Sequence, residues 1–110
     1  MTAAGASAGA NAGGVASRAV VAVDNPARWA RQLASHLGRH TPPTDEDGGQ
    51  RLHFAAGSCL LNCADGRLVL AARAADPAGL RRVEEIVGSH LERFAAKLGL
   101  TVTWTAAKPS

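Results

Sequence analysis

The residues with the clearest chemical potential are two histidines and a cysteine on apolar stretches of the chain. His36 and His90 lie on or beside the apolar faces of two expected helices, and Cys59 lies on an expected strand. A buried imidazole needs partners for its ring nitrogens, or it loses hydration without compensation. Imidazole and thiolate are also ligands for transition metals and for haem iron. The three residues are therefore candidate ligands of a metal or haem site beneath the helices.

Core packing is the commoner role for such residues. The imidazoles would then bond to the backbone or to neighbouring side chains, and Cys59 would fill a gap beside Phe54 and Ala72. Catalysis by Cys59, with His90 as its base, would need an exposed thiol with a lowered pKa. The strand pattern directs this thiol into the core instead, so we expect no catalytic site.

Two pairs of residues that lie close together in the sequence are weaker candidates for a metal site or a disulfide. His36 and His40 are four residues apart, as in helical metal sites, but Gly38 between them interrupts helical geometry. Cys59 and Cys63 would lie roughly 13 Å apart along one strand. A disulfide needs Cα atoms within about 7 Å, so we expect two free thiols.

Periodic apolar residues predict the elements that position these side chains. Short β-branched runs indicate strands, and apolar residues three and four apart after Asp-Pro or Asn-Pro pairs indicate helices. Together these elements predict an α+β, two-layer fold of order β-α-β-β-β-α-β, with an antiparallel sheet and both helices on one face. In chain order we expect a strand over 18–23, a helix over 26–38, strands over 50–55, 58–63 and 67–73, a helix over 77–98 and a strand over 100–104.

Alternation along the three central strands assigns their side chains to two faces. Turns at 56–57 and 65–66 would place Phe54 opposite Cys59 and Leu61 opposite Leu70, all toward the helices. The outer face would carry Leu60, Val69 and His53, a candidate partner surface because exposed apolar patches often mark interfaces. The predicted inner face consists of Leu52, Phe54, Cys59, Leu61, Cys63, Leu68, Leu70 and Ala72.

Length and composition indicate one small domain. Of the 110 residues, 24 are alanine, and the Ala/Gly-rich stretch 1–17 is expected to be a disordered leader before a domain over 18–105 and a tail over 106–110. Without a secretory signal or a disulfide framework, we expect a cytoplasmic protein. A net charge of +3 is small, and the outer sheet face lacks an aromatic platform. We therefore expect no nucleic-acid partner, and the absence of a long apolar run argues against a membrane.

Four segments of the chain together form a recognisable pattern. They are the stretch 25–37, Gly57-Ser58-Cys59, the block 87–94 that includes His90, and 102–104. Over about residues 18–105 they resemble the bacterial DUF2218 family, which has no established biochemical function. The resemblance implies an α+β domain like half of a TATA-binding-protein-like fold. It also implies a context near siderophore or iron-uptake genes.

The expected function is a small accessory domain for iron or siderophore handling that binds rather than catalyses. His36, His90 and Cys59 would hold a transition metal or haem, and Arg93, three residues after His90, would hold a carboxylate or phosphate of a ligand. The alternative is an interaction module without a ligand site. It would form a homodimer or dock onto a siderophore-handling protein through Leu60, Val69 and His53.

Overall fold

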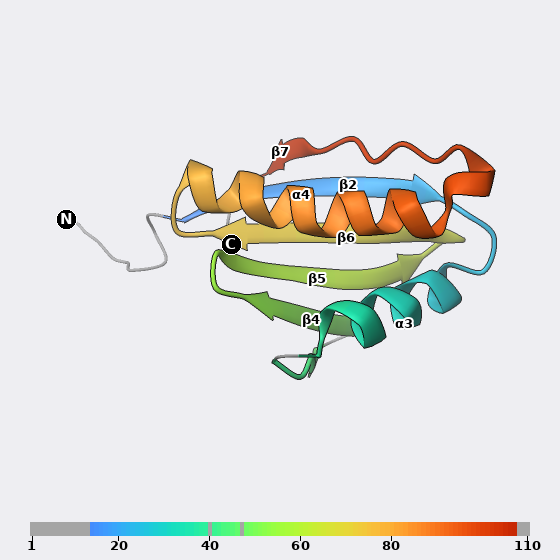
Figure 1. Ribbon diagram of the computed structural model, residues 1–110, viewed down its shortest axis with the longest axis horizontal. Coiled ribbons are helices and arrows are strands. Elements are labelled where there is room, and N and C mark those ends of the chain that lie inside the picture. Colours follow the sequence, from blue (N-terminus) through green and yellow to red (C-terminus); the bar gives the residue numbers. More distant parts are fainter. Residues whose placement is uncertain (1–13, 40, 47, 108–110) are drawn as a thin grey trace.

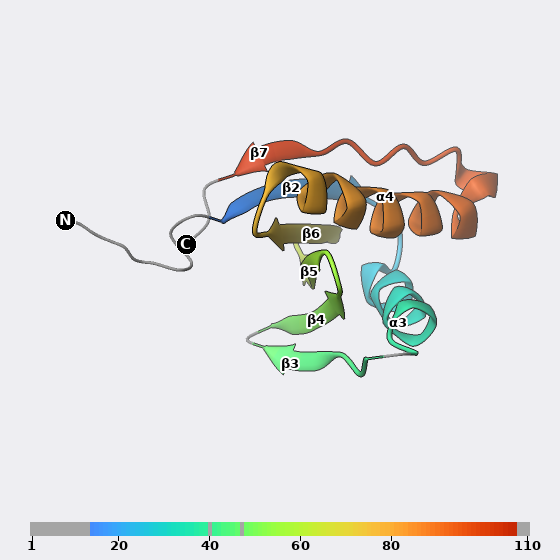
Figure 2. The same ribbon diagram turned by 60° about the vertical axis from the view of Figure 1, so that its left-hand side comes forward.

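An open antiparallel sheet with two helices on one face makes up the chain, which confirms the predicted α+β class (Figure 1). The computed structural model describes residues 14–39, 41–46 and 48–107, and within them the sheet order is β3-β4-β5-β6-β2-β7. In Figure 2 both helices lie on the same side of the sheet. The elements are β2 (Val15–Ala22), α3 (Pro26–Leu37), β3 (Thr44–Glu46), β4 (Gly49–Phe54), β5 (Gly57–Ala64), β6 (Arg67–Ala74), α4 (Pro77–Phe94), the 3₁₀ helix η1 (Ala96–Leu98) and β7 (Thr105–Ala107).

The inner face of the sheet and one side of each helix form a single core. Along α4, Val83, Val87 and Leu91 recur every four residues and are fully buried. Each buried aliphatic side chain of this size contributes about 1.5–3 kcal/mol relative to full exposure. This burial fixes both helices against the sheet. The core comprises Ala19, Val21, Leu33, Ala34, Leu52, Cys59, Leu61, Leu68, Leu70, Ala72, Val83, Val87 and Leu91.

The hairpin between β5 and β6 has the predicted register. Cys59 lies opposite Ala72, and Leu61 lies opposite Leu70. Because register and face are linked in a strand, this pairing turns Leu61 of β5 and Leu68 and Leu70 of β6 toward the helices.

The hairpin between β4 and β5 differs from the prediction by two residues. Leu52 lies opposite Cys59 rather than Leu61, and the turn occupies residues 55–56. Gly57 is the first residue of β5, and a Cβ atom there would overlap the Arg73 carbonyl oxygen of β6. This glycine thus permits a close approach of two strands and is not a turn residue. A shift of two residues preserves the faces, so the predicted inner leucines remain inside.

Strand β2 extends further toward the N-terminus than expected. It begins at Val15, three residues before the expected domain boundary, and pairs with β6 along its whole length. Backbone pairing does not need large side chains, so this Ala- and Ser-containing stretch can join the sheet. The rest of the expected leader, residues 1–13, lies outside the described residues.

The expected strand over 100–104 is not formed. Strand β7 begins at Thr105, the last residue of the expected domain, and continues into the expected tail. The segment packs along α4. The backbone N–H of Val102 donates to Glu92 Oε2 at 2.8 Å. Gly88 of α4 faces Trp104, since a Cβ atom at this glycine would lie 3.3 Å from the indole nitrogen. Side-chain packing on the helix thus replaces sheet pairing here.

The helix starts follow the sequence signals more closely than the helix ends. Asp76 caps α4 by accepting from the Gly79 N–H at 2.8 Å, whereas Asn25 makes no side-chain cap to α3. Helix α4 ends at Phe94, four residues before the expected end, and the 3₁₀ turn after it leaves Leu98 61% exposed. Among the described residues, no helix is long and apolar enough to cross a membrane.

Candidate functional site

His36 and His90 meet where α3 and α4 lie side by side on the sheet. Their ring centroids are 5.1 Å apart, with the ring planes tilted by 47°. His36 lies exposed in the last turn of α3, and His90 is half-buried on α4. The helices therefore bring together two imidazoles that are 54 residues apart in the sequence.

A backbone hydrogen bond fixes the orientation of the His90 ring. Its Nδ1 lies 2.6 Å from the carbonyl oxygen of Ile86, one helical turn earlier. A carbonyl oxygen only accepts hydrogen bonds, so Nδ1 carries the proton in this contact. In the neutral ring Nε2 then has the free lone pair. Metal-binding histidines commonly use this same Nδ1–H to carbonyl bond to set their orientation.

Phe94 packs against both imidazoles. Its ring meets His36 edge-on, with centroids 5.3 Å apart and an interplanar angle of 86°. It also lies 6.3 Å from His90 in a similar arrangement. Edge-to-face packing of this kind is favourable and directional, so Phe94 restricts the positions of the two rings.

Cys59 is not part of this cluster. It is fully buried on the inner face of β5, and burial raises the pKa of its thiol to about 12. A neutral, enclosed thiol is a poor nucleophile and a poor metal ligand. Within the described part of the chain, no three His, Cys, Asp or Glu side chains come close enough to hold a metal ion together. The structure thus joins His36 to His90 and leaves Cys59 in the core.

The remaining sequence candidates are scattered. Cys63 is exposed beside the 65–66 turn rather than inside as predicted, and both thiols are free. Arg93 is exposed in the last turn of α4, three residues after His90. His40 lies outside the described residues.

The outer face of the sheet carries the expected surface residues and one that the sequence analysis missed. Leu60 and Val69 are half-buried, and His53 Nε2 lies 2.9 Å from Thr44 Oγ1. Val20 of β2 is 49% exposed and lies opposite Val69 in the β2–β6 pair. Alternation in β2 could have placed Val20 outward. Its position beside Val69 follows only from the strand order.

The two cysteines should differ sharply in reactivity. At about pH 8, native protein should react at Cys63 with an alkylating reagent, while Cys59 stays unmodified because its thiol is enclosed and neutral below about pH 12. Mass spectrometry of the native protein and of protein alkylated in denaturant measures both sites. Rapid labelling of Cys59 in the native protein would contradict its burial and would make Cys59 a candidate nucleophile.

Comparisons with known proteins identify the family and support the fold. No curated protein matches the chain. The solved NMR structure of PA4090 from Pseudomonas aeruginosa superposes with a TM-score of 0.68 at 21% identity, covering 83% of this chain and 95% of that one. The family described as "Uncharacterized protein conserved in bacteria (DUF2218)" matches residues 18–105. Because the match covers well over half of the chain and includes both helices, the chain belongs to the DUF2218 family.

Proposed function

We propose that this chain is a small metal-binding accessory domain, in which His36 and His90 hold one transition-metal ion. The observation that carries the proposal is the 5.1 Å separation of the two imidazole centres. With metal–nitrogen bonds of about 2.0–2.1 Å, neighbouring imidazoles on one ion have centres roughly 4.5–5.2 Å apart. The hydrogen bond to Ile86 supports the same assignment, because it leaves Nε2 of His90 as the ligand atom.

The spacing favours a metal ion over axial ligation of haem. Imidazoles on opposite sides of a haem iron would have centres roughly 6.4 Å apart at the same bond lengths. The observed 5.1 Å is shorter and fits two adjacent positions around a single ion. Ions that accept imidazole include zinc, copper, nickel and ferrous iron.

Two protein ligands leave coordination positions open to an external molecule. The exposure of His36 gives such a molecule access from solvent. In our proposal the other ligands are oxygen donors of a chelating compound, and Arg93 binds one of its carboxylates. This arrangement suits a domain that passes a chelated metal to another protein, and handling of iron or siderophores is one role of that class.

Metal binding should depend on both histidines of the pair. Apo-protein titrated calorimetrically with Zn²⁺, and with Fe²⁺ under anaerobic conditions, should bind one equivalent. His36→Ala and His90→Ala should each weaken binding at least about tenfold, or ~1.4 kcal/mol, because each removes one ligand. His53→Ala is the matched control, since this histidine lies on the other face of the sheet. Equal losses in all three variants, or no binding by the wild-type protein, would overturn the proposal.

A second candidate function is self-association through the outer sheet face. It is favoured by the 49% exposure of Val20, which extends the apolar patch of Leu60 and Val69. A second copy that covers these residues would remove them from water.

Self-association predicts that Leu60→Arg is monomeric where the wild-type protein is dimeric, because the new charge lies in the apolar patch. Leu98→Arg is the control, since this leucine is 61% exposed on the 3₁₀ turn, outside the sheet. Light scattering over a range of concentrations measures the mass. A monomeric wild-type protein at millimolar concentration rules out this function and leaves the metal proposal untouched.

A further inference from the structure

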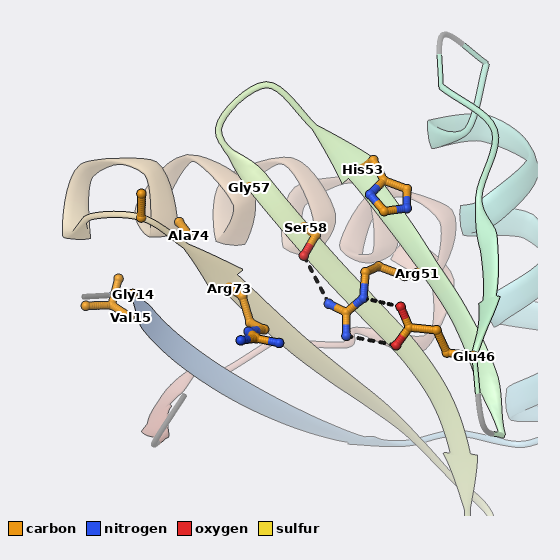
Figure 3. Close-up of a pocket in the computed structure, with 10 residues that line it drawn as sticks. Gly14, Val15, Glu46, Arg51, His53, Gly57, Ser58, Arg73 and Ala74 are labelled. Carbon is orange, nitrogen blue, oxygen red and sulfur yellow. Dashed lines mark hydrogen bonds and ion pairs between the residues drawn. The ribbon is translucent and has the colours of Figure 1, made fainter. Parts of the chain in front are cut away.

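The outer sheet face contains a cavity of about 560 Å³ that the histidine pair does not use. It lies where β4 and β6 end and where β5 and β2 begin, on the side of the sheet away from the helices (Figure 3). Its lining combines basic and hydroxyl side chains with small apolar ones. The main polar lining residues are Glu46, Arg51, His53, Ser58 and Arg73.

Arg51 is held in a fixed orientation at this cavity. Its Nε and Nη2 donate to the two carboxylate oxygens of Glu46, and its Nη1 donates to Ser58 Oγ at 3.0 Å. The Arg51 side chain is only 15% exposed, so the guanidinium lies against the sheet rather than extending into solvent. A guanidinium fixed with two parallel donors is the geometry that recognises a carboxylate.

The cavity is positively charged apart from Glu46. Arg73 and His53 contribute side chains to the same lining, and Figure 3 shows Arg51 of β4 and Arg73 of β6 projecting from the same face, with β5 between the two strands. The hydrogen bond from Arg51 holds the pKa of Glu46 below its usual value, and the charges of Arg51, His53 and Arg73 act in the same direction. Among the described lining residues, Glu46 is the only carboxylate facing this positive charge.

The Glu46 side chain is held less firmly than the Arg51 guanidinium that it binds. It lies at the end of β3, a three-residue edge strand whose residues are all exposed, and its side chain is 38% exposed. Because the Glu46 side of this ion pair is open to solvent, an external anion can reach the same donors and compete for them. Ser58, already bonded to Arg51, offers its hydroxyl to that anion as well.

We propose that this cavity binds a small polycarboxylate, one of whose carboxylates replaces Glu46 on Arg51. The remaining carboxylates face Arg73 and His53, and the methyl groups of Ala74 and Ala75 contact the carbon chain of the ligand. Glu46 is then an intramolecular competitor that lowers the affinity of the resting site. A planar carboxylate is preferred over a tetrahedral phosphate because Arg51 already binds a carboxylate with two parallel hydrogen bonds.

The test is a titration of ¹⁵N-labelled, metal-free protein with tricarballylate, a simple tricarboxylate, at neutral pH and constant ionic strength. Backbone amide shifts of Ser58 and Arg73 report on the cavity. Glu46→Gln should tighten binding about fivefold, because it removes the competing carboxylate of an exposed ion pair. Arg51→Lys, which keeps the charge and loses the paired donors, should weaken binding about tenfold.

Arg67→Ala is the matched control, since Arg67 lies at the other end of the same strand as Arg73 and outside the cavity lining. Its affinity should stay within about twofold of the wild type if the site is specific. Thermal unfolding of each variant checks that the sheet is intact. Three results would each overturn the proposal. They are an unchanged affinity of Glu46→Gln for tricarballylate, an equal loss of affinity in Arg51→Lys and Arg67→Ala, and phosphate binding as tight as that of tricarballylate.

Discussion

The burial of one sheet face beneath α3 and α4 is the interaction on which the rest of the structure depends. Val83, Val87 and Leu91 of α4 are excluded from water together with Leu61, Leu68 and Leu70 of the sheet. This apolar contact fixes where the two helices lie on the sheet, and so it sets the distance between His36 and His90. The same contact encloses Cys59. The core thereby separates the thiol from the imidazoles and gives each a different chemistry.

The two sides of the sheet offer different kinds of binding chemistry. At the helices, two imidazoles are held together, and one of them is oriented by a carbonyl four residues earlier. On the open side, charged side chains project from the strands, and Arg51 is fixed by Glu46 and Ser58. In our proposals the first arrangement holds a metal ion and the second holds an anion. Rigid elements supply both sets of donors, which reduces the ordering that binding requires.

The sequence predicted features that depend on local periodicity. Alternation placed Leu61, Leu68 and Leu70 inside, and the Asp76-Pro77 pair marked the start of α4. Features that depend on contacts between distant segments were missed. The first hairpin is shifted because Gly57 must accommodate β6, and 100–104 packs on α4 instead of forming a strand. Similarly, His36, His90 and Cys59 were expected to form one site. That Cys59 lies apart from the two histidines, and that Arg51 contacts Glu46, is visible only in the three-dimensional structure.

The central claim is that the helix packing presents one nitrogen of each histidine to the same metal ion. Long-range ¹H–¹⁵N correlation spectra of the imidazole nitrogens, recorded during a Zn²⁺ titration, test it most directly. We expect one nitrogen of His36 and Nε2 of His90 to shift together and to saturate at one equivalent of Zn²⁺. Nδ1 of His90 should stay protonated and bonded to Ile86. A shift of only one histidine, or metal ligation through Nδ1 of His90, would contradict the account.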